Sequence, residues 1–226
     1  MRMVGGAVLA VLAAACAGRA DGPSAQPPPP PPERLIRPGA TPLTTVAADL
    51  DGDGADEMVI SSVSNEVDDL GLARPFLEAF DVRDGRWTRV FDATGPAPPG
   101  PGAPPSMLSA EGFVSQAVAT LEIVDFAADG RPEVAVGVAN FGASAGPVEL
   151  WVVSMADDGA LATLLYRTSA RGGEISVEGD RLRFEYGVYR SRDPGCCPSR
   201  FAVETIGWNP AADRVEVLER RETRAR

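Results

Sequence analysis

The stretch Val46–Ile60, VAADLDGDGADEMVI, places five carboxylates and two glycines within the nine positions from Asp49 to Glu57. Apolar residues precede and follow these positions, which predicts a loop between two strands. Carboxylates this close repel one another unless a cation lies among them. Hard oxygen ligands on a glycine-containing loop suit Ca²⁺, which takes roughly six to eight oxygens at about 2.3–2.6 Å. We therefore expect a calcium-binding loop between two β-strands.

The composition excludes several classes of function. The chain has no His, so it can form neither a Ser-His-Asp triad nor a His metal ligand, and all 21 of its basic side chains are Arg. The formal net charge of −11 argues against nucleic acid and anionic membrane surfaces as partners. That charge fits either a binder of divalent cations or a solvated acidic surface.

The N-terminus has the pattern of an export signal. A short positive start leads into the apolar run Val4–Ala15, which is too short for a membrane-spanning helix of about twenty residues. The end of this run, LAAAC at Leu12–Cys16, resembles the lipobox of bacterial lipoproteins, in which the cysteine carries the lipid. This resemblance implies a signal peptide over residues 1–15 and a lipid anchor on Cys16. An ordinary secretory signal, with Cys16 incidental, is the alternative.

Residues 16–40 then have the composition of a Pro-rich tether. The six prolines of Pro27–Pro32 favour an extended polyproline conformation. With either form of the signal, the mature protein is expected outside the cytoplasm. With the lipid anchor, it is held at the bacterial cell membrane.

The folded region contains an internal repeat. The run Leu121–Val134, LEIVDFAADGRPEV, aligns with the opening stretch and matches Asp125 to Asp49, an offset of 125 − 49 = 76 positions. The turn Asp158-Gly159 matches the hairpin turn Asp84-Gly85 at an offset of 159 − 85 = 74. An offset this constant indicates two related units.

Each unit is predicted to contain four strands, and a third unit without an acidic loop follows. The expected strands are Thr44–Ala48, Met58–Val63, Phe76–Val82 and Trp87–Phe91 in the first unit, Val134–Val138, Val148–Val153 and Leu161–Tyr166 after the second loop, and Glu174–Glu178, Arg181–Tyr189, Phe201–Trp208 and Arg214–Leu218 in the third. Residues 181–186, RLRFEY, alternate as in a sheet with one solvated face.

These patterns predict an all-β fold of tandem four-stranded antiparallel units. Three units are fewer than a closed β-propeller needs, so we expect a partial propeller or a stack of sheets. The expected boundaries are 41–94 for the first unit, 95–117 for a Pro/Gly-rich linker, 118–170 for the second unit and 171–226 for the third.

The acidic loop resembles the Asp-x-Asp-x-Asp-Gly-x-x-Asp/Glu calcium loop of FG-GAP (VCBS) repeats, and the resemblance covers roughly residues 41–167. An EF-hand is excluded, because position twelve of the loop is Ile60 and its flanks are predicted strands. The resemblance implies that the carboxylates of Asp49, Asp51, Asp53 and Glu57 and the backbone carbonyl of Ala55 bind Ca²⁺. Gly54 would lie at the sharp turn.

The second loop is a weaker candidate for metal binding. It keeps Asp125, Asp129 and Glu133, with Arg131 at the position of the carbonyl ligand, but has Ala127 in place of an aspartate. With one carboxylate fewer, we expect it to bind Ca²⁺ weakly or not at all. For both loops the alternative is an Asx-type turn that joins two strands without metal.

Two adjacent cysteines, Cys196 and Cys197, lie in a Pro/Gly turn. A compartment outside the cytoplasm favours oxidation. With Cys16 lipidated, no other cysteine is available, so the options are a strained vicinal disulfide, free thiols or a bridge to a partner. A rigid turn without chemistry is the alternative to a redox or ligand-binding role. The Cys-Cys-Pro-Ser turn before a Trp-containing strand also resembles the LppP/LprE lipoprotein family, over about the last fifty residues. That resemblance implies no known activity.

The sequence therefore favours a non-enzymatic, calcium-stabilised, membrane-anchored lipoprotein that binds a protein or carbohydrate and no nucleic acid. The alternative is an envelope hydrolase that uses carboxylates, or a thiol-redox protein that uses Cys196 and Cys197. The isolated acids Glu174, Glu185 and Glu204 are expected on strand surfaces, so no catalytic residues are assigned.

Overall fold

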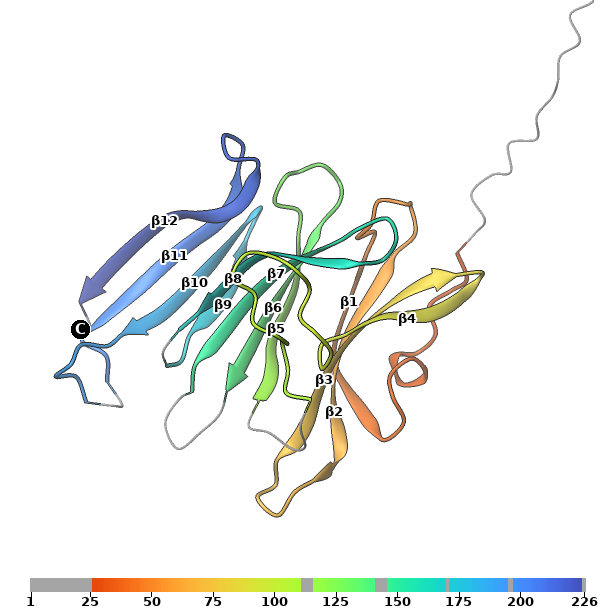
Figure 1. Cartoon of the computed structure of the whole chain (residues 1–226), viewed down its shortest axis with the longest axis horizontal. Coiled ribbons are helices and arrows are strands. Elements are labelled where there is room, and N and C mark those ends of the chain that lie inside the picture. The colour runs from red at the N-terminus through yellow and green to blue at the C-terminus, as the bar shows by residue number, and fades with distance from the viewer. Residues whose placement is uncertain (1–25, 111–115, 141–145, 170, 195–196, 225–226) are drawn as a thin grey trace, which may run out of the picture.

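The computed structural model describes residues 26–110, 116–140, 146–169, 171–194 and 197–224, and Figure 1 shows their arrangement. Within these ranges the chain forms twelve β-strands, one turn of 3-10 helix, η1 (Pro32–Arg34), and no α-helix. The strands make three four-stranded antiparallel sheets, none of which closes into a barrel. The predicted all-β class and the tandem four-stranded units are confirmed.

Sheet 1 contains β1 (Ala40–Ala48), β2 (Glu57–Val67), β3 (Ala73–Arg83) and β4 (Arg86–Asp92) in sequential order. A two-residue turn, Asp84-Gly85, joins the last two strands. Its φ angles of 52° and 72° are both positive, which is the type I′ geometry that an Asp-Gly pair favours in hairpins. The predicted hairpin is therefore present.

Sheets 2 and 3 repeat the same strand order. Sheet 2 contains β5 (Gln116–Val124), β6 (Glu133–Asn140), β7 (Val148–Met155) and β8 (Leu161–Thr168), and sheet 3 contains β9 (Glu174–Glu178), β10 (Arg181–Val188), β11 (Arg200–Asn209) and β12 (Arg214–Arg224). Most strands are longer than predicted, because cross-strand pairing extends regular backbone into the polar ends of each run.

The sheets stack face to face, with sheet 2 in the middle. One core lies between sheets 1 and 2, where Val59 and Leu77 of sheet 1 pack in one cluster with Val136 and Trp151 of sheet 2. A second core lies on the other face of sheet 2, where residues such as Leu150 pack with Leu182, Phe184 and Ile206 of sheet 3. Because both faces of sheet 2 are buried, β6 is an almost continuous apolar run rather than an alternating one.

The Pro/Gly-rich segment after sheet 1 belongs to the core. It is irregular, as expected for the linker, but Met107 and Leu108 are each only 1 % exposed between sheets 1 and 2. Thr163 of β8 donates its N–H to the carbonyl of Pro99 and its hydroxyl to the carbonyl of Pro98, both at 2.8 Å. The segment therefore lies along the edge of β8 instead of acting as a free spacer.

The last residues of the expected tether also join the fold. Ile36 is buried against Met58, Ile60 and Phe80 on the outer face of sheet 1. This face of the sheet is apolar and would otherwise be exposed, which explains why the chain crosses it before β1 begins. Sheet 3 ends the stack with a polar outer face, as the alternation in β10 predicts, where Arg183 pairs with Glu185.

Candidate metal centre

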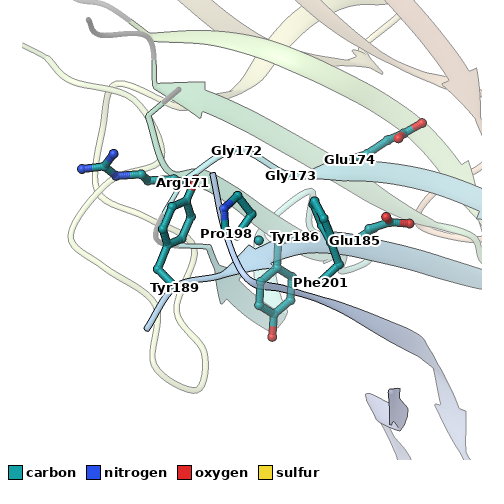
Figure 2. A pocket seen from close by; sticks show the side chains of 10 residues that line it. Arg171, Gly172, Gly173, Glu174, Glu185, Tyr186, Tyr189, Pro198 and Phe201 are labelled. Carbon is teal, nitrogen blue, oxygen red and sulfur yellow. The ribbon is translucent and has the colours of Figure 1, made fainter. Parts of the chain in front are cut away.

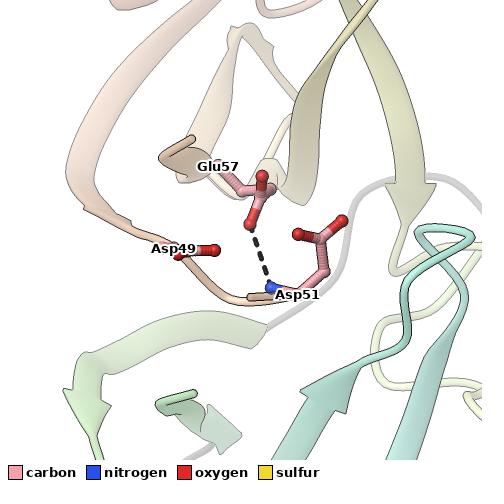
Figure 3. A group of neighbouring side chains, drawn as sticks. All are labelled: Asp49, Asp51 and Glu57. Atoms are coloured by element: carbon pink, nitrogen blue, oxygen red, sulfur yellow. Dashed lines mark hydrogen bonds between the residues drawn. The ribbon is translucent and has the colours of Figure 1, made fainter. Parts of the chain in front are cut away.

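Three carboxylates of the acidic loop converge where β1 ends and β2 begins. Carboxylate oxygens of Asp49, Asp51 and Glu57 all lie within 4.8 Å of one another, and Figure 3 shows the three side chains around the loop. Glu57 is fully buried and Asp51 is 6 % exposed. Among the described residues this is the one acidic group with spacing suited to a metal ion.

Backbone N–H groups hold the loop in shape. The two oxygens of Asp49 accept hydrogen bonds from the N–H groups of Gly52 and Gly54, at 2.8 and 3.0 Å. The Oε2 atom of Glu57 accepts from the N–H of Leu50 at 2.7 Å. Both glycines have positive φ, 82° and 88°, which L side chains rarely adopt. The Asp-x-Asp-Gly-Asp-Gly order is thus required by the backbone as well as by any ligand.

The interior of the loop is under electrostatic strain when no cation is present. Burial, reinforced by the charges of Asp51 and Asp81, raises the pKa of Glu57 to about 7 against the hydrogen bonds that would lower it. Burial also raises the pKa of Asp51. The second oxygen of Glu57, Oε1, is buried and has no hydrogen-bond partner within the described part of the chain. An unpaired buried carboxylate oxygen beside two further carboxylates is an arrangement that a cation would satisfy.

The remaining predicted ligands lie around this centre. Asp53 is exposed and outside the group of three, with its Oδ1 accepting from the N–H of Ala55 at 2.7 Å. Asp56 is exposed, and its N–H and carbonyl both bond to the side-chain amide of Gln26. The structure therefore brings together three of the four predicted carboxylates.

Two contacts of the first loop, those of Asp81 and Arg131, were not predicted from the sequence. Asp81, at the end of β3, is 8 % exposed, contributes to the raised pKa of Glu57, and pairs with Arg83 at 3.0 Å. The register of β2 and β3 could have revealed Asp81, because the pairing of Met58 with Phe80 places the next residue, Asp81, beside the loop. Arg131 reaches across from the second loop, a contact that only the stacking of the sheets produces.

The Arg131 contact is close. The Cδ and Nε atoms of Arg131 lie 3.0 and 3.1 Å from the position that a Cβ on Gly52 would occupy. Its Nη2 donates to Asp157 at 2.7 Å. Arg131, which occupies the position of the carbonyl ligand in the second loop, thus packs its side chain against the first loop.

The second loop repeats the hydrogen bonds of the first at the 76-residue offset. Glu133 Oε2 accepts from the N–H of Phe126 at 3.2 Å, and Asp125 Oδ2 accepts from the N–H of Gly130 at 3.0 Å. Burial raises the pKa of Glu133 to about 7. Ala127 supplies no carboxylate, and no metal-suited group forms here among the described residues. A pocket of about 260 Å³ opens beside Ala127 and Asp129.

A separate pocket of about 340 Å³ lies at one end of sheet 3 (Figure 2). Aromatic rings, including Tyr189 and Phe201, form much of its wall, and the guanidinium of Arg171 lies 5.5 Å from the centre of the Tyr189 ring. Glu174 and Glu185 are cross-strand partners at its rim. Both are at least partly exposed, as predicted, and Glu185 is paired with an arginine of the same sheet.

The expectation of a surface position for Glu204 is wrong. Glu204 is fully buried between sheets 2 and 3, where it accepts from Arg167 and from the hydroxyl of Tyr186 at 2.7 Å. It shares its strand face with Ala202 and Ile206, which are also buried, because alternate residues of a strand point to the same side. The apolar residues Ala202 and Ile206, two positions before and after Glu204, could therefore have predicted its burial from the sequence.

The cysteine assignments fall largely outside the described residues. Cys16 and Cys196 are not among them, so the lipid anchor and the vicinal disulfide stay predictions. Cys197 is exposed.

In comparisons with known proteins, no protein family and no curated sequence matches this chain. The part of the chain that the structure describes contains no helix with the length and apolar character needed to cross a membrane.

Proposed function

We propose that this chain is a non-enzymatic, lipid-anchored extracytoplasmic binding module whose first sheet is stabilised by Ca²⁺. The calcium ligands would be the carboxylates of Asp49, Asp51, Asp53 and Glu57 and the carbonyl of Ala55, as the resemblance to FG-GAP (VCBS) repeats implies. The observation that carries the proposal is the buried, unpaired Oε1 of Glu57, which lies with Asp49 and Asp51 in the group of three carboxylates.

The proposed role of the ion is structural. It would supply positive charge among carboxylates that otherwise repel one another, so that binding energy becomes folding energy. The loop over residues 49–57 joins β1 to β2 in sheet 1, and Leu50 within it packs into the core between sheets 1 and 2. Calcium at this place would therefore support the stacking of sheet 1 on sheet 2.

The pocket of sheet 3 is the surface that we expect a protein or carbohydrate ligand to use. Concave, partly aromatic pockets with a few polar groups are the usual binding sites for such ligands. The rings of Tyr189 and Phe201 provide aromatic contacts there, and the cross-strand neighbours Glu174 and Glu185 provide polar ones.

Thermal unfolding with and without EGTA tests the calcium proposal. We expect chelation to lower the Tm of the wild-type chain, and we expect Asp51→Asn to abolish that difference because Asp51 belongs to the converging group. Asp56→Asn is the matched control: it removes the same charge from the same loop, but Asp56 is exposed and outside the group. An unchanged Tm on chelation, or equal effects of the two substitutions, would remove calcium from the proposed function.

A further inference from the structure

A pocket lined by arginines lies on the outer face of sheet 1, away from the acidic loop. It has a volume of about 480 Å³ and is lined by residues 34–38, at the end of the expected tether, and by side chains of β3 and β4. Among the described residues, Arg34, Arg37 and Arg89 are the only charged side chains in its wall, and Phe80 and Trp87 add aromatic rings. The charge in this wall is thus entirely cationic, in a chain whose net charge is −11.

Of the two carboxylates that pair with these arginines, Glu78 lies beneath them and Asp92 is partly exposed beside them. The side chain of Glu78 is 0 % exposed, and its Oε1 accepts from Arg37 at 3.1 Å and from Arg89 at 2.6 Å. Arg37 also pairs with Asp92 at 2.6 Å. The Arg89 side chain is 47 % exposed. Because Glu78 is buried and the Arg89 side chain is more exposed than that of Asp92 (29 %), the mouth of the pocket presents the guanidinium of Arg89 to the solvent.

Arg34 adds a positive charge that no carboxylate balances. It lies in η1, is exposed, and forms no ion pair with any acidic side chain of the described residues. The exposed Glu33 beside Arg34 in η1 does not line the pocket. Among the side chains that line the pocket and their ion-pair partners, three arginines face the two carboxylates Glu78 and Asp92, which leaves one positive charge in excess. An anionic group in the pocket would balance it.

We infer that this pocket binds the phosphate-bearing headgroup of an anionic membrane lipid. Guanidinium groups match phosphate oxygens in bidentate geometry. Trp side chains favour the membrane–water interface, where one edge of the ring is apolar and the other polar. A pocket with arginines at its mouth and Trp87 and Phe80 in its wall therefore suits an amphiphile better than a free ion.

The position of the pocket in the chain brings it close to a membrane. The inference rests on the proposed anchor at Cys16, which lies ten residues before Gln26 (26 − 16 = 10), the first described residue. Ten residues span at most about 35 Å. Figure 1 shows η1 and β4 at the end of the stack away from β12, the same end at which the described chain begins. The net charge of −11 opposes contact with an anionic surface, but charges more than about 10 Å away are largely screened at 0.1 M salt, so the side chains at the mouth of the pocket contribute most.

Co-sedimentation with lipid vesicles tests the inference on the full chain carrying Cys16→Ser, so that no lipid anchor contributes. EDTA is present, so that calcium cannot bridge acidic groups. We expect the protein to sediment with phosphatidylglycerol vesicles and not with phosphatidylcholine vesicles. We expect Arg34→Gln to weaken the binding about fivefold, the usual contribution of one arginine near an anionic surface. We expect Arg34→Lys to weaken it less, because lysine keeps the charge but not the bidentate geometry of the guanidinium group.

Arg86→Gln is the control variant. Arg86 is an exposed arginine at the start of β4 that lies outside the pocket, and its substitution makes the same change in net charge. Equal loss of binding in the Arg86 and Arg34 variants, or equal binding to both vesicle types, would overturn the inference.

A free-phosphate arm separates the two possible sources of the anion. If millimolar inorganic phosphate changes the Trp fluorescence, if Trp87→Phe abolishes that change, and if anionic vesicles leave the protein in solution, the pocket takes a soluble phosphate and the lipid assignment is wrong. Metabolic labelling of the wild-type chain with a fatty acid tests the anchor separately. A failed labelling with retained sedimentation would disprove the anchor and leave the headgroup site standing.

Discussion

Replacing Glu57 by Gln should make the calcium-free protein more stable at pH 8. The pKa of Glu57 in the folded chain is about 7, compared with an ordinary value of 4.5. At about 1.4 kcal/mol for each tenfold change in proton affinity, this interval corresponds to about 3 kcal/mol. The substituted amide would be neutral at every pH, could keep the hydrogen bond from the Leu50 N–H, and would place an N–H donor near the other two carboxylates. We therefore expect the free energy of unfolding in EDTA to rise by about 3 kcal/mol.

The sign of this effect depends on pH. The folded state holds the Glu57 proton up to about pH 7, whereas the unfolded chain releases it near pH 4.5, so the wild-type protein without calcium loses stability as the pH rises between these values. Below pH 4.5 the carboxyl is protonated in both states and resembles the amide. The advantage of Glu57→Gln should therefore be small at pH 4.5, grow across this interval and become constant above about pH 7.

Urea unfolding followed by Trp fluorescence measures the effect, in EDTA and in excess Ca²⁺. Wild type should gain about 2.7 kcal/mol at a calcium concentration roughly one hundred times Kd, and Glu57→Gln should gain almost nothing. Glu133→Gln is the matched control, because burial also raises the pKa of Glu133 to about 7 but its loop has one carboxylate fewer. It should stabilise the calcium-free protein and keep the calcium response. A Glu57→Gln protein that is less stable than wild type in EDTA at pH 8 would refute the reasoning.

Two further predictions concern the contacts between sheets. Arg167→Met should lower the free energy of unfolding, measured in urea, by about 2–3 kcal/mol, because it leaves the buried Glu204 carboxylate without its main partner. The control Arg183→Met breaks a partly exposed ion pair and should lower the free energy of unfolding by less than about 1 kcal/mol. Thr163→Val should lower the free energy of unfolding by about 1–3 kcal/mol, because the buried carbonyl of Pro98 loses its hydrogen-bond donor. Native-state hydrogen exchange should then show faster exchange in β8. Unchanged exchange there would contradict the assigned contact.

The sequence was sufficient for features that depend on neighbouring residues. The Asp84-Gly85 hairpin and the glycines of the acidic loop both follow from backbone conformations that few residue types adopt. The recurrence of the loop at an offset of 76 positions also predicted matching hydrogen bonds in two sheets, such as those that Glu57 and Glu133 accept.

Contacts between sheets could not be read in the same way. Arg131 reaches Gly52 only because sheet 2 stacks on sheet 1 in one particular orientation, and strand periodicity carries no information on that orientation. Met107 and Leu108 lie in a segment whose Pro and Gly content is typical of a linker, so their burial gave no periodic signal. Glu204 is an exception among these contacts between sheets, because the apolar residues Ala202 and Ile206 on the same face of β11 could have predicted its burial.

The Pro98–Pro99 contact with β8 also affects how the molecule behaves at high concentration. A strand at the edge of a sheet can pair with a strand of another molecule and begin aggregation. At β8 this opportunity is reduced, because the segment that occupies the edge is rich in proline, which has no N–H to offer a further strand. In sheet 3, the edge strand β12 carries charges of both signs between Arg214 and Arg224, which disfavour the same pairing. Association of molecules through the edges of β8 and β12 is therefore disfavoured.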